Sequence, residues 1–272
     1  MADEDYQMEK ENNLTSSYKS FTYQKIKIII YLSILPISLI LVMIILLSLA
    51  SEKGKLPENM DHSQFVIIKD IIPNIITEMR YYSSFNFVGS RIDGYEEPVA
   101  LLTKQATEKL KKANECFNEK GYLIKIYDSY RPQRAVDHFV RWRDDLKDEK
   151  MKKYFYPDLT KKEVFEKGYV STRSGHSRGS TLDITLIHKE NGTDVDFGSC
   201  FDYFGDKAHY NYTEISPEQK KNRELLKKIM EENDFIALPE EWWHFTLKNE
   251  PYPNTYFNFP VNATLIRRGI KK

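Results

Sequence analysis

The residues best suited to chemistry lie in two short segments that are far apart in the chain. The first, residues 174–183, has the sequence SGHSRGSTLD, with His176 on a glycine-flanked loop and Asp183 at the start of an apolar run. Asp183 stands between Leu182 and Ile184. A carboxylate in such a run needs a partner, because burying an unpaired charge is expensive. A bound metal ion would supply that partner.

The second segment is the aromatic stretch 240–245, with the sequence EEWWHF. Glu241 and His244 are three residues apart, and a straight strand would place them on opposite faces. A turn or bulge at the two tryptophans, or a turn of helix, would bring both side chains to one site. The two indoles would also exclude water and strengthen local electrostatic interactions.

Together the segments supply enough ligands for a catalytic zinc site, which uses three protein ligands and leaves a fourth position for water. His176, Asp183 and His244 fit the ligand role, and Glu241 would be free to take a proton from the water. Simpler interpretations exist for each: a surface histidine, an ion pair of Asp183 with Arg178, and a solvated glutamate. The remaining histidines have no comparable setting and are interpreted as structural or surface residues: His62, His138, His188 and His209.

Arg131 is a third candidate, in the stretch DSYRPQ at residues 128–133. This stretch joins a predicted strand to a predicted helix. The permanent charge and fixed donors of Arg131 would hold a substrate carboxylate or stabilise an oxyanion. The alternative is a structural ion pair, and the stretch alone does not decide between them.

The elements that must position these residues alternate irregularly along the chain. Apolar residues at helical spacing predict a helix over 103–120, and a second helix begins at Pro132. Ser216 followed by Pro217 predicts the start of a third helix. Alternating or apolar runs predict three strands, at 122–127, 181–187 and 243–247. Because strict βαβ repetition is missing, the mixture favours an α+β fold.

Composition indicates a folded protein with a small partner. Of the 272 residues, 41% are hydrophobic and 29% charged, and Lys+Arg and Asp+Glu balance at 40 each. This balance gives no basic field of the kind that attracts nucleic acid, so no such partner is expected. The two cysteines, Cys116 and Cys200, form no CxxC pair, which excludes a thiolate zinc knuckle. A disulfide between them requires an oxidising compartment and a fold that brings them together.

An uncharged apolar run at residues 28–50 is long enough to cross a bilayer as a helix. Two interpretations compete: a single-pass signal anchor with a cytoplasmic N-terminus, and a cleaved signal peptide that ends at 48–50. Both place residues 51–272 across the membrane, so the catalytic domain is expected to be extracytoplasmic or secreted. Three triplets fit the N-glycosylation pattern, at Asn191, Asn211 and Asn262.

The chain is therefore predicted to have five segments. A disordered polar tail spans residues 1–24, the transmembrane helix or signal anchor residues 25–50, and a polar linker residues 51–64. The globular domain spans residues 65–260, and a basic C-terminal tail spans residues 261–272, whose end from Arg267 to Lys272 is predicted to fray.

The stretches DSYRPQ, SGHSRGSTLD and EWWHF, in this order, resemble the D-alanyl-D-alanine dipeptidase family of zinc peptidases. The resemblance covers residues 65–260 and includes the segments 81–95 and 201–204. It implies an α+β domain with a central antiparallel sheet flanked by helices. The apolar run at 28–50, and not the resemblance, predicts one N-terminal transmembrane helix before this domain. The resemblance further implies a small dipeptide substrate, D-Ala-D-Ala, hydrolysed with one Zn²⁺ per chain.

The resemblance also implies roles for named residues. Zn²⁺ would be held by His176, Asp183 and His244. Glu241 would act as the general base, and Arg131 would stabilise the tetrahedral intermediate. The pocket that recognises the free amine of the dipeptide would be lined by three further residues: Tyr82, Ser174 and Asp202.

The chain departs from the family pattern in several places. A membrane segment is unusual there, Thr181 stands where alanine is expected, and Cys200 stands where proline is expected. Cys200 lies two residues from Asp202, which puts a strict preference for D-Ala-D-Ala in question. Two alternative functions therefore stay open: a related cell-wall D,D-carboxypeptidase, and a non-catalytic zinc-binding surface protein.

Overall fold

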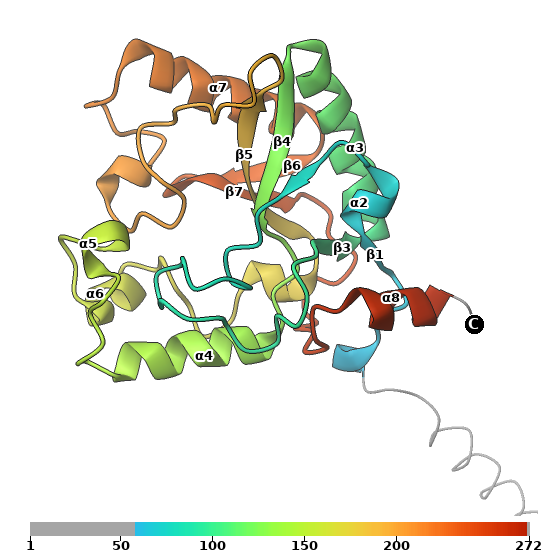
Figure 1. The fold of residues 1–272 in the computed structure, drawn as a ribbon, viewed down its shortest axis with the longest axis horizontal. Coiled ribbons are helices and arrows are strands. Elements are labelled where there is room, and N and C mark those ends of the chain that lie inside the picture. The colour runs from blue at the N-terminus through green and yellow to red at the C-terminus, as the bar shows by residue number, and fades with distance from the viewer. Residues whose placement is uncertain (1–57, 271–272) are drawn as a thin grey trace, which may run out of the picture. The chain divides into compact units, whose positions relative to one another are not determined.

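Five strands form the sheet that organises the fold (Figure 1). The computed structural model describes residues 58–270, and the strands lie in the order β2-β4-β5-β7-β6. Their bounds are Ile76–Thr77 for β2, Tyr122–Asp128 for β4, Thr181–His188 for β5, Glu241–Leu247 for β7 and Phe235–Leu238 for β6. The three strands predicted from the sequence are all present, each slightly longer than expected.

The sheet is antiparallel except at one edge. β4, β5, β7 and β6 pair antiparallel in turn, whereas β2 pairs parallel with β4. A parallel pair needs a long crossover, and the chain between β2 and β4 contains the helix α3 (Lys104–Glu119). The expected α+β class with flanking helices is confirmed, and the expected central antiparallel sheet is present in β4, β5, β7 and β6, to which β2 adds a parallel edge strand.

Two long helices begin where the sequence supplies a cap. Thr103 accepts a hydrogen bond from the backbone N–H of Ala106 at the start of α3. Ser216 and Gln219 form a capping box at the start of α7 (Pro217–Glu232), with proline at the first helical position. Both helices bury one apolar face, as their spacing predicts, and they lie near each other at the top of Figure 1.

The other elements are shorter. β1 (Phe65–Ile67) and β3 (Leu101–Thr103) form a separate antiparallel pair. The helix α4 (Gln133–Asp144) follows Pro132, as expected, and lies at the end of the sheet opposite α7 (Figure 1). The remaining helices are η1 (Glu58–Met60), α2 (Ile68–Ile71), α5 (Lys152–Phe155), α6 (Lys161–Glu166), η2 (Gly175–Arg178), η3 (Asp206–Ala208) and α8 (Ala263–Ile270).

An aromatic cluster around Phe87 links α4 to the loops that follow β2 and β5. The ring centroid of Phe87 lies 4.8 Å from that of Phe139, 4.9 Å from Trp142 and 5.1 Å from Phe204. All four side chains are buried. Burying each large apolar side chain contributes about 1.5–3 kcal/mol, so the cluster forms a firm wall beside the site described below.

Most of the segment predicted to be a basic C-terminal tail, residues 261–270, belongs to the fold. The backbone of Val261 hydrogen-bonds to Gly94, Glu96 and Glu97, and Ile266 of α8 is buried. Apolar side chains in this segment pack on the domain, which outweighs the local basic charge. The last residues of the expected linker are also ordered, because η1 begins at Glu58.

The predicted membrane segment at 28–50 lies outside the described residues, as do the tail 1–24 and the linker up to residue 57. Between residues 58 and 270, none of the helices is long and apolar enough to cross a bilayer. Cys116 and Cys200 are both free, so the structure contains no disulfide between them.

Candidate active site

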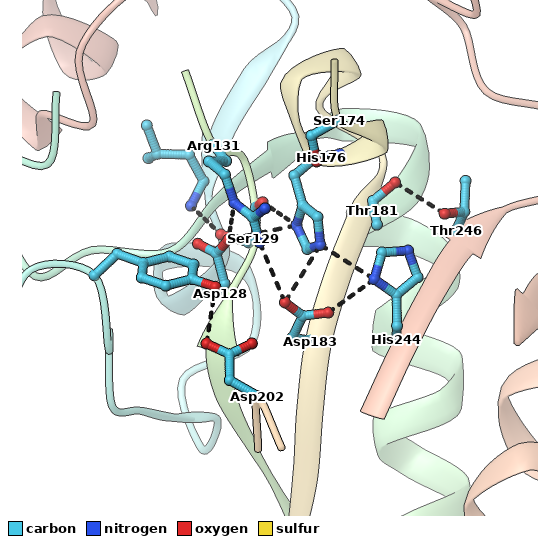
Figure 2. A network of polar contacts seen from close by, with 12 residues as sticks. Asp128, Ser129, Arg131, Ser174, His176, Thr181, Asp183, Asp202, His244 and Thr246 are labelled. Carbon is cyan, nitrogen blue, oxygen red and sulfur yellow. Dashed lines mark hydrogen bonds and ion pairs between the residues drawn. The ribbon is translucent and has the colours of Figure 1, made fainter. Parts of the chain in front are cut away.

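Three predicted ligands converge on one point at the middle of the sheet. Asp183 of β5 and His244 of β7 are register partners in the antiparallel ladder. His176 comes from η2, just before β5. Its Nε2 lies 3.3 Å from Asp183 Oδ2 and 3.3 Å from His244 Nδ1 (Figure 2). One ligand atom from each of the three residues lies within 4.8 Å of the others, so a single cation would reach all three.

The turn that carries His176 is fixed at both ends. Ser174 Oγ accepts a hydrogen bond from the backbone N–H of His176 at its start. Gly179 ends the turn with φ +79°, and a Cβ at this position would collide with the ring of Phe65. Glycine is therefore required here for both conformation and space.

The ring of His176 is oriented by a backbone carbonyl. Its Nδ1 lies 2.7 Å from the carbonyl oxygen of Ser129, and the side chain is 1% exposed. A carbonyl can only accept, so Nδ1 carries the proton and donates it. Nε2 is then left with a free lone pair directed at Asp183 and His244, which is the orientation that a metal-binding histidine needs.

A bulge in β7 brings Glu241 to the same site as His244. Ala237 of β6 pairs with Phe245, but the next residue, Leu238, pairs with Glu241, so residues 242–244 are extra on the β7 side. Glu241 Oε2 consequently lies 3.3 Å from His244 Nδ1 and is largely buried. Of the arrangements that the sequence left open at the two tryptophans, the structure shows the bulge.

Arg131 is held beside the cluster by a buried carboxylate. Its Nε donates a hydrogen bond of 2.9 Å to Asp128 Oδ2, and its Nη2 lies 3.6 Å from Asp183 Oδ2. The guanidinium also lies over the ring of Tyr81, 4.9 Å from the centroid. Asp128 is held in turn by Tyr95, whose hydroxyl donates to Asp128 Oδ1 at 2.6 Å. The ion pair considered from the sequence is therefore present, and it fixes Arg131 at the site.

The cluster favours bound positive charge. The pKa of Asp202 is raised by burial and further by the charge of Asp183. Burial also raises the pKa of Asp183, but the neighbouring His176 and His244 outweigh it and hold the pKa below its usual value. Burial lowers the pKa of His244, whereas hydrogen bonds to Asp183 and Glu241 raise it, to about 9 overall. Asp183 and Glu241 thus stabilise positive charge at His244, where a bound metal cation would take the place of the proton.

A cavity of about 190 Å³ opens over the cluster. Arg131, Ser174, Asp202 and Glu241 line it together with the three proposed ligands. Tyr82 does not line it. The neighbouring residue Tyr81 does, and its hydroxyl donates a hydrogen bond of 2.9 Å to Asp202 Oδ2.

Sequence reasoning missed three residues that organise the site. Tyr81 stands in an irregular segment, where no periodicity tells which of two adjacent tyrosines points inward. Asp128 and Ser129 directly precede Arg131 in the stretch DSYRPQ, but nothing in that stretch shows that they support Arg131 and His176 from behind. A buried aspartate at the end of an apolar strand was the available signal.

An α+β domain with a buried two-histidine, one-aspartate cluster beside a spare glutamate is the arrangement of a metal-dependent hydrolase. The family model described as D-ala-D-ala dipeptidase matches residues 61–262. The chain therefore belongs to the D-Ala-D-Ala dipeptidase family of peptidases, as the sequence motifs predicted.

Curated relatives agree with this assignment. A D-alanyl-D-alanine dipeptidase of Enterococcus faecium is 39% identical over 72% of this chain and 98% of its own length. One from Streptomyces coelicolor is 37% identical over 72% of this chain and 98% of its own length. One from Escherichia coli is 32% identical over 69% and 86%. The similarity thus covers nearly the full length of the first two relatives.

Proposed function

We propose that this protein is a zinc-dependent dipeptidase that hydrolyses D-Ala-D-Ala, with Glu241 as the general base. The observation that carries the proposal is the convergence of His176, Asp183 and His244 within 4.8 Å, with Glu241 Oε2 3.3 Å from His244. Membership of the D-Ala-D-Ala dipeptidase family supports the substrate class.

The donor set fits zinc. Two imidazole nitrogens and one carboxylate oxygen are ligands that zinc accepts in catalytic sites. Asp183 Oδ1 is buried and lies 3.1 Å from His244 Nδ1. Ligand atoms held this close together in a buried site are placed as a shared cation would require.

The side chains around the ligands then have defined tasks. His176, Asp183 and His244 would hold the zinc ion, which would supply the Lewis acidity that lowers the pKa of a water molecule and polarises the substrate carbonyl. Glu241 takes the proton from the attacking water and later delivers it to the leaving amine. Arg131, fixed by Asp128, donates hydrogen bonds to the negative oxygen that develops, an effect worth about 3–4 kcal/mol.

The same cavity would orient the dipeptide. Asp202 is buried at its wall and would pair with the substrate ammonium group, with Tyr81 holding the carboxylate through its hydroxyl. Ser174 lies on the other side of the metal cluster from Asp202 in Figure 2 and lines the same cavity. Tyr82 has no place in this scheme. The cavity, of about 190 Å³, is small, which favours a short substrate such as a dipeptide.

The alternatives differ in substrate length and in catalysis. A D,D-carboxypeptidase on this scaffold would prefer long wall peptides, and a non-catalytic surface protein would bind zinc without any turnover. The buried position of Glu241 beside His244 favours an enzyme, because a purely structural site has no use for a spare base.

The test is hydrolysis of a dipeptide panel of mixed D and L stereochemistry by the full-length chain, with and without a chelator. D-Ala-D-Ala should be cleaved, and the chelator should abolish cleavage. Glu241→Gln should lower kcat about 10²–10⁴-fold with zinc content unchanged, because only the base is removed. Glu240→Gln is the matched control, since Glu240 is exposed and should leave kcat unchanged. A full rate in Glu241→Gln would refute the assignment of the base.

We further propose that the catalytic domain lies across the membrane, reached through the apolar run at 28–50. Protease added to intact cells should then degrade the domain, and removal of residues 1–50 should release the enzyme from the membrane fraction. A domain protected in intact cells and degraded only after lysis would place it in the cytoplasm instead.

A further inference from the structure

A buried guanidinium in α7 holds the backbone on both sides of Asp202. The side chain of Arg223 is 2% exposed and donates three hydrogen bonds of 2.7 Å, all to backbone carbonyls. Its Nε bonds to Phe197, its Nη1 to His209 and its Nη2 to Lys207. Within residues 58–270 no carboxylate forms an ion pair with it, and burial lowers its pKa.

The three acceptors bracket the segment 198–206, here named the Asp202 loop. Phe197 precedes this loop, and Lys207 and His209 follow it. One side chain therefore ties together the beginning and the end of the loop. Neighbouring residues of α7 reinforce the beginning, because Asn222 Nδ2 donates to Asp196 O at 2.9 Å and Gln219 Nε2 donates to Asp196 Oδ2 at 2.8 Å.

The Asp202 loop holds its central residue in an unfavourable backbone conformation. Asp202 has φ +59°, in the left-handed region that non-glycine residues rarely adopt. Contacts of the surrounding residues help to hold such a conformation. Inside the cavity one hydrogen bond, from the Tyr81 hydroxyl, holds the carboxylate. Outside the cavity, the Phe204 N–H donates to Phe155 O, and Trp242 Nε1 donates to Ser199 Oγ. Arg223 adds the restraint that joins the two ends of the loop at its base.

We infer that Arg223 is a positioning residue for substrate recognition: it closes the base of the Asp202 loop so that the Asp202 carboxylate reaches the substrate ammonium group. This inference rests on the proposed function, in which Asp202 binds the ammonium group of the substrate. Arg223 touches neither the cavity nor the proposed zinc ligands within the described structure. Its loss should therefore weaken substrate binding and leave the chemical step largely intact.

The chemistry of arginine explains why this position needs that residue. Three carbonyls that approach from different parts of the chain require three donors in a fixed plane, which a guanidinium supplies. Lysine keeps the charge but offers a single small ammonium group on a flexible stem. Arg223→Lys should therefore keep a buried cation and lose part of the three-point anchor.

A double-mutant cycle tests the inference with four full-length, zinc-loaded proteins: wild type, Arg223→Lys, Asp202→Asn, and the double variant. For D-Ala-D-Ala hydrolysis, Arg223→Lys should raise KM about tenfold and lower kcat less than about threefold. In the Asp202→Asn background the same substitution should change KM less than about twofold, because the group it positions is gone. Equal effects of Arg223→Lys in both backgrounds would overturn the inference, and Arg223 would then be a general structural residue.

Failure of the underlying function gives a different result. If Asp202→Asn alone leaves KM unchanged, Asp202 does not bind the substrate ammonium group, and Arg223 then has no positioning role. If Asp202→Asn raises KM but the two substitutions are additive, only the role of Arg223 is wrong. The cycle therefore separates the two failures.

Hydrogen exchange gives a readout that does not depend on turnover. The backbone N–H of Phe204 donates to Phe155 O at 2.7 Å and reports on the Asp202 loop. Arg223→Lys should speed its exchange about tenfold, whereas amides of β4 and β5 should be unaffected. Unchanged exchange at Phe204 would overturn the inference.

A matched control is Lys161→Met. Lys161 is also a buried cation that donates only to backbone carbonyls, those of Trp142 and Asp145. The Lys161→Met substitution should lower thermal stability without raising KM. A rise in KM as large as that caused by Arg223→Lys would show that the effect of Arg223→Lys on KM is not specific. If Arg223→Lys does not fold, Asn222→Ala removes the bond to Asp196 O and enters the same cycle, with a smaller rise in KM expected.

Discussion

The two sides of the active site are built in different ways. Asp183 and His244 sit opposite each other on neighbouring strands, so backbone ladder hydrogen bonds set their separation. Asp202 lies on an irregular loop in a left-handed conformation, and side chains from Tyr81 and α7 set its position. Sheet register therefore positions the proposed metal chemistry, whereas side-chain anchors position the proposed substrate recognition. Substitutions on the strand side should change metal affinity and kcat, and those on the loop side should change KM.

The largest effect is expected from the strand side, at Asp183. Asp183→Ala removes one of three ligands and should weaken zinc affinity at least about 100-fold, with activity falling to that of the chelated enzyme. The zinc content after dialysis and a competition titration measure the loss of zinc affinity. Asp194→Ala is the control, because this exposed aspartate pairs with Lys125 away from the cluster. If Asp183→Ala retained zinc, Asp183 would not be a zinc ligand, and the strand side would not position the metal.

Arg131 should give the next largest effect. Arg131→Met removes donors aimed at the developing negative charge, so kcat should fall about 10²–10³-fold while KM changes little. Arg131→Lys keeps the charge and loses the hydrogen bond from Nε to Asp128, and should recover only part of the rate. Steady-state kinetics on the zinc-loaded variants measures kcat and KM. If Arg131→Met raised KM and spared kcat, Arg131 would belong with the recognition side.

A smaller effect, in KM, is expected on the loop side at Asp202. Asp202→Asn removes a charge-assisted bond to the substrate amine, worth about 1.5–3 kcal/mol, so KM should rise roughly 10–100-fold. The zinc affinity of this variant should match that of the wild type. Calorimetric titration with zinc and steady-state kinetics measure the two quantities. A fall in zinc affinity would show that strand and loop are not separable.

The smallest effect separates two adjacent tyrosines. Tyr81→Phe removes a neutral donor to Asp202, worth about 0.5–1.5 kcal/mol, and should raise KM roughly 2–10-fold. Tyr82→Phe should leave KM unchanged, since Tyr82 does not line the cavity. The reverse result would restore the sequence-based expectation for Tyr82.

The strands, the main helices and the family followed from local patterns. The caps at Thr103 and Ser216 and the apolar runs around Asp183 and His244 each depend on a few adjacent residues. The parallel pairing of β2 and the docking of α8 did not follow, because both depend on distant partners. β2 has only two residues, and α8 combines basic and apolar side chains so that either a tail or a packed helix was compatible with its sequence.

By itself, the sequence determined which chemical groups are available: two histidines, an aspartate within an apolar run, and a glutamate beside two tryptophans. It also determined the family, because motifs in a fixed order suffice for that. Only the tertiary structure decided how these groups meet. The β7 bulge, the support of His176 by Ser129 and of Arg131 by Asp128, and the choice of Tyr81 over Tyr82 depend on contacts between residues far apart in the chain. Such contacts form when distant segments bury their apolar faces together, and no local pattern records them.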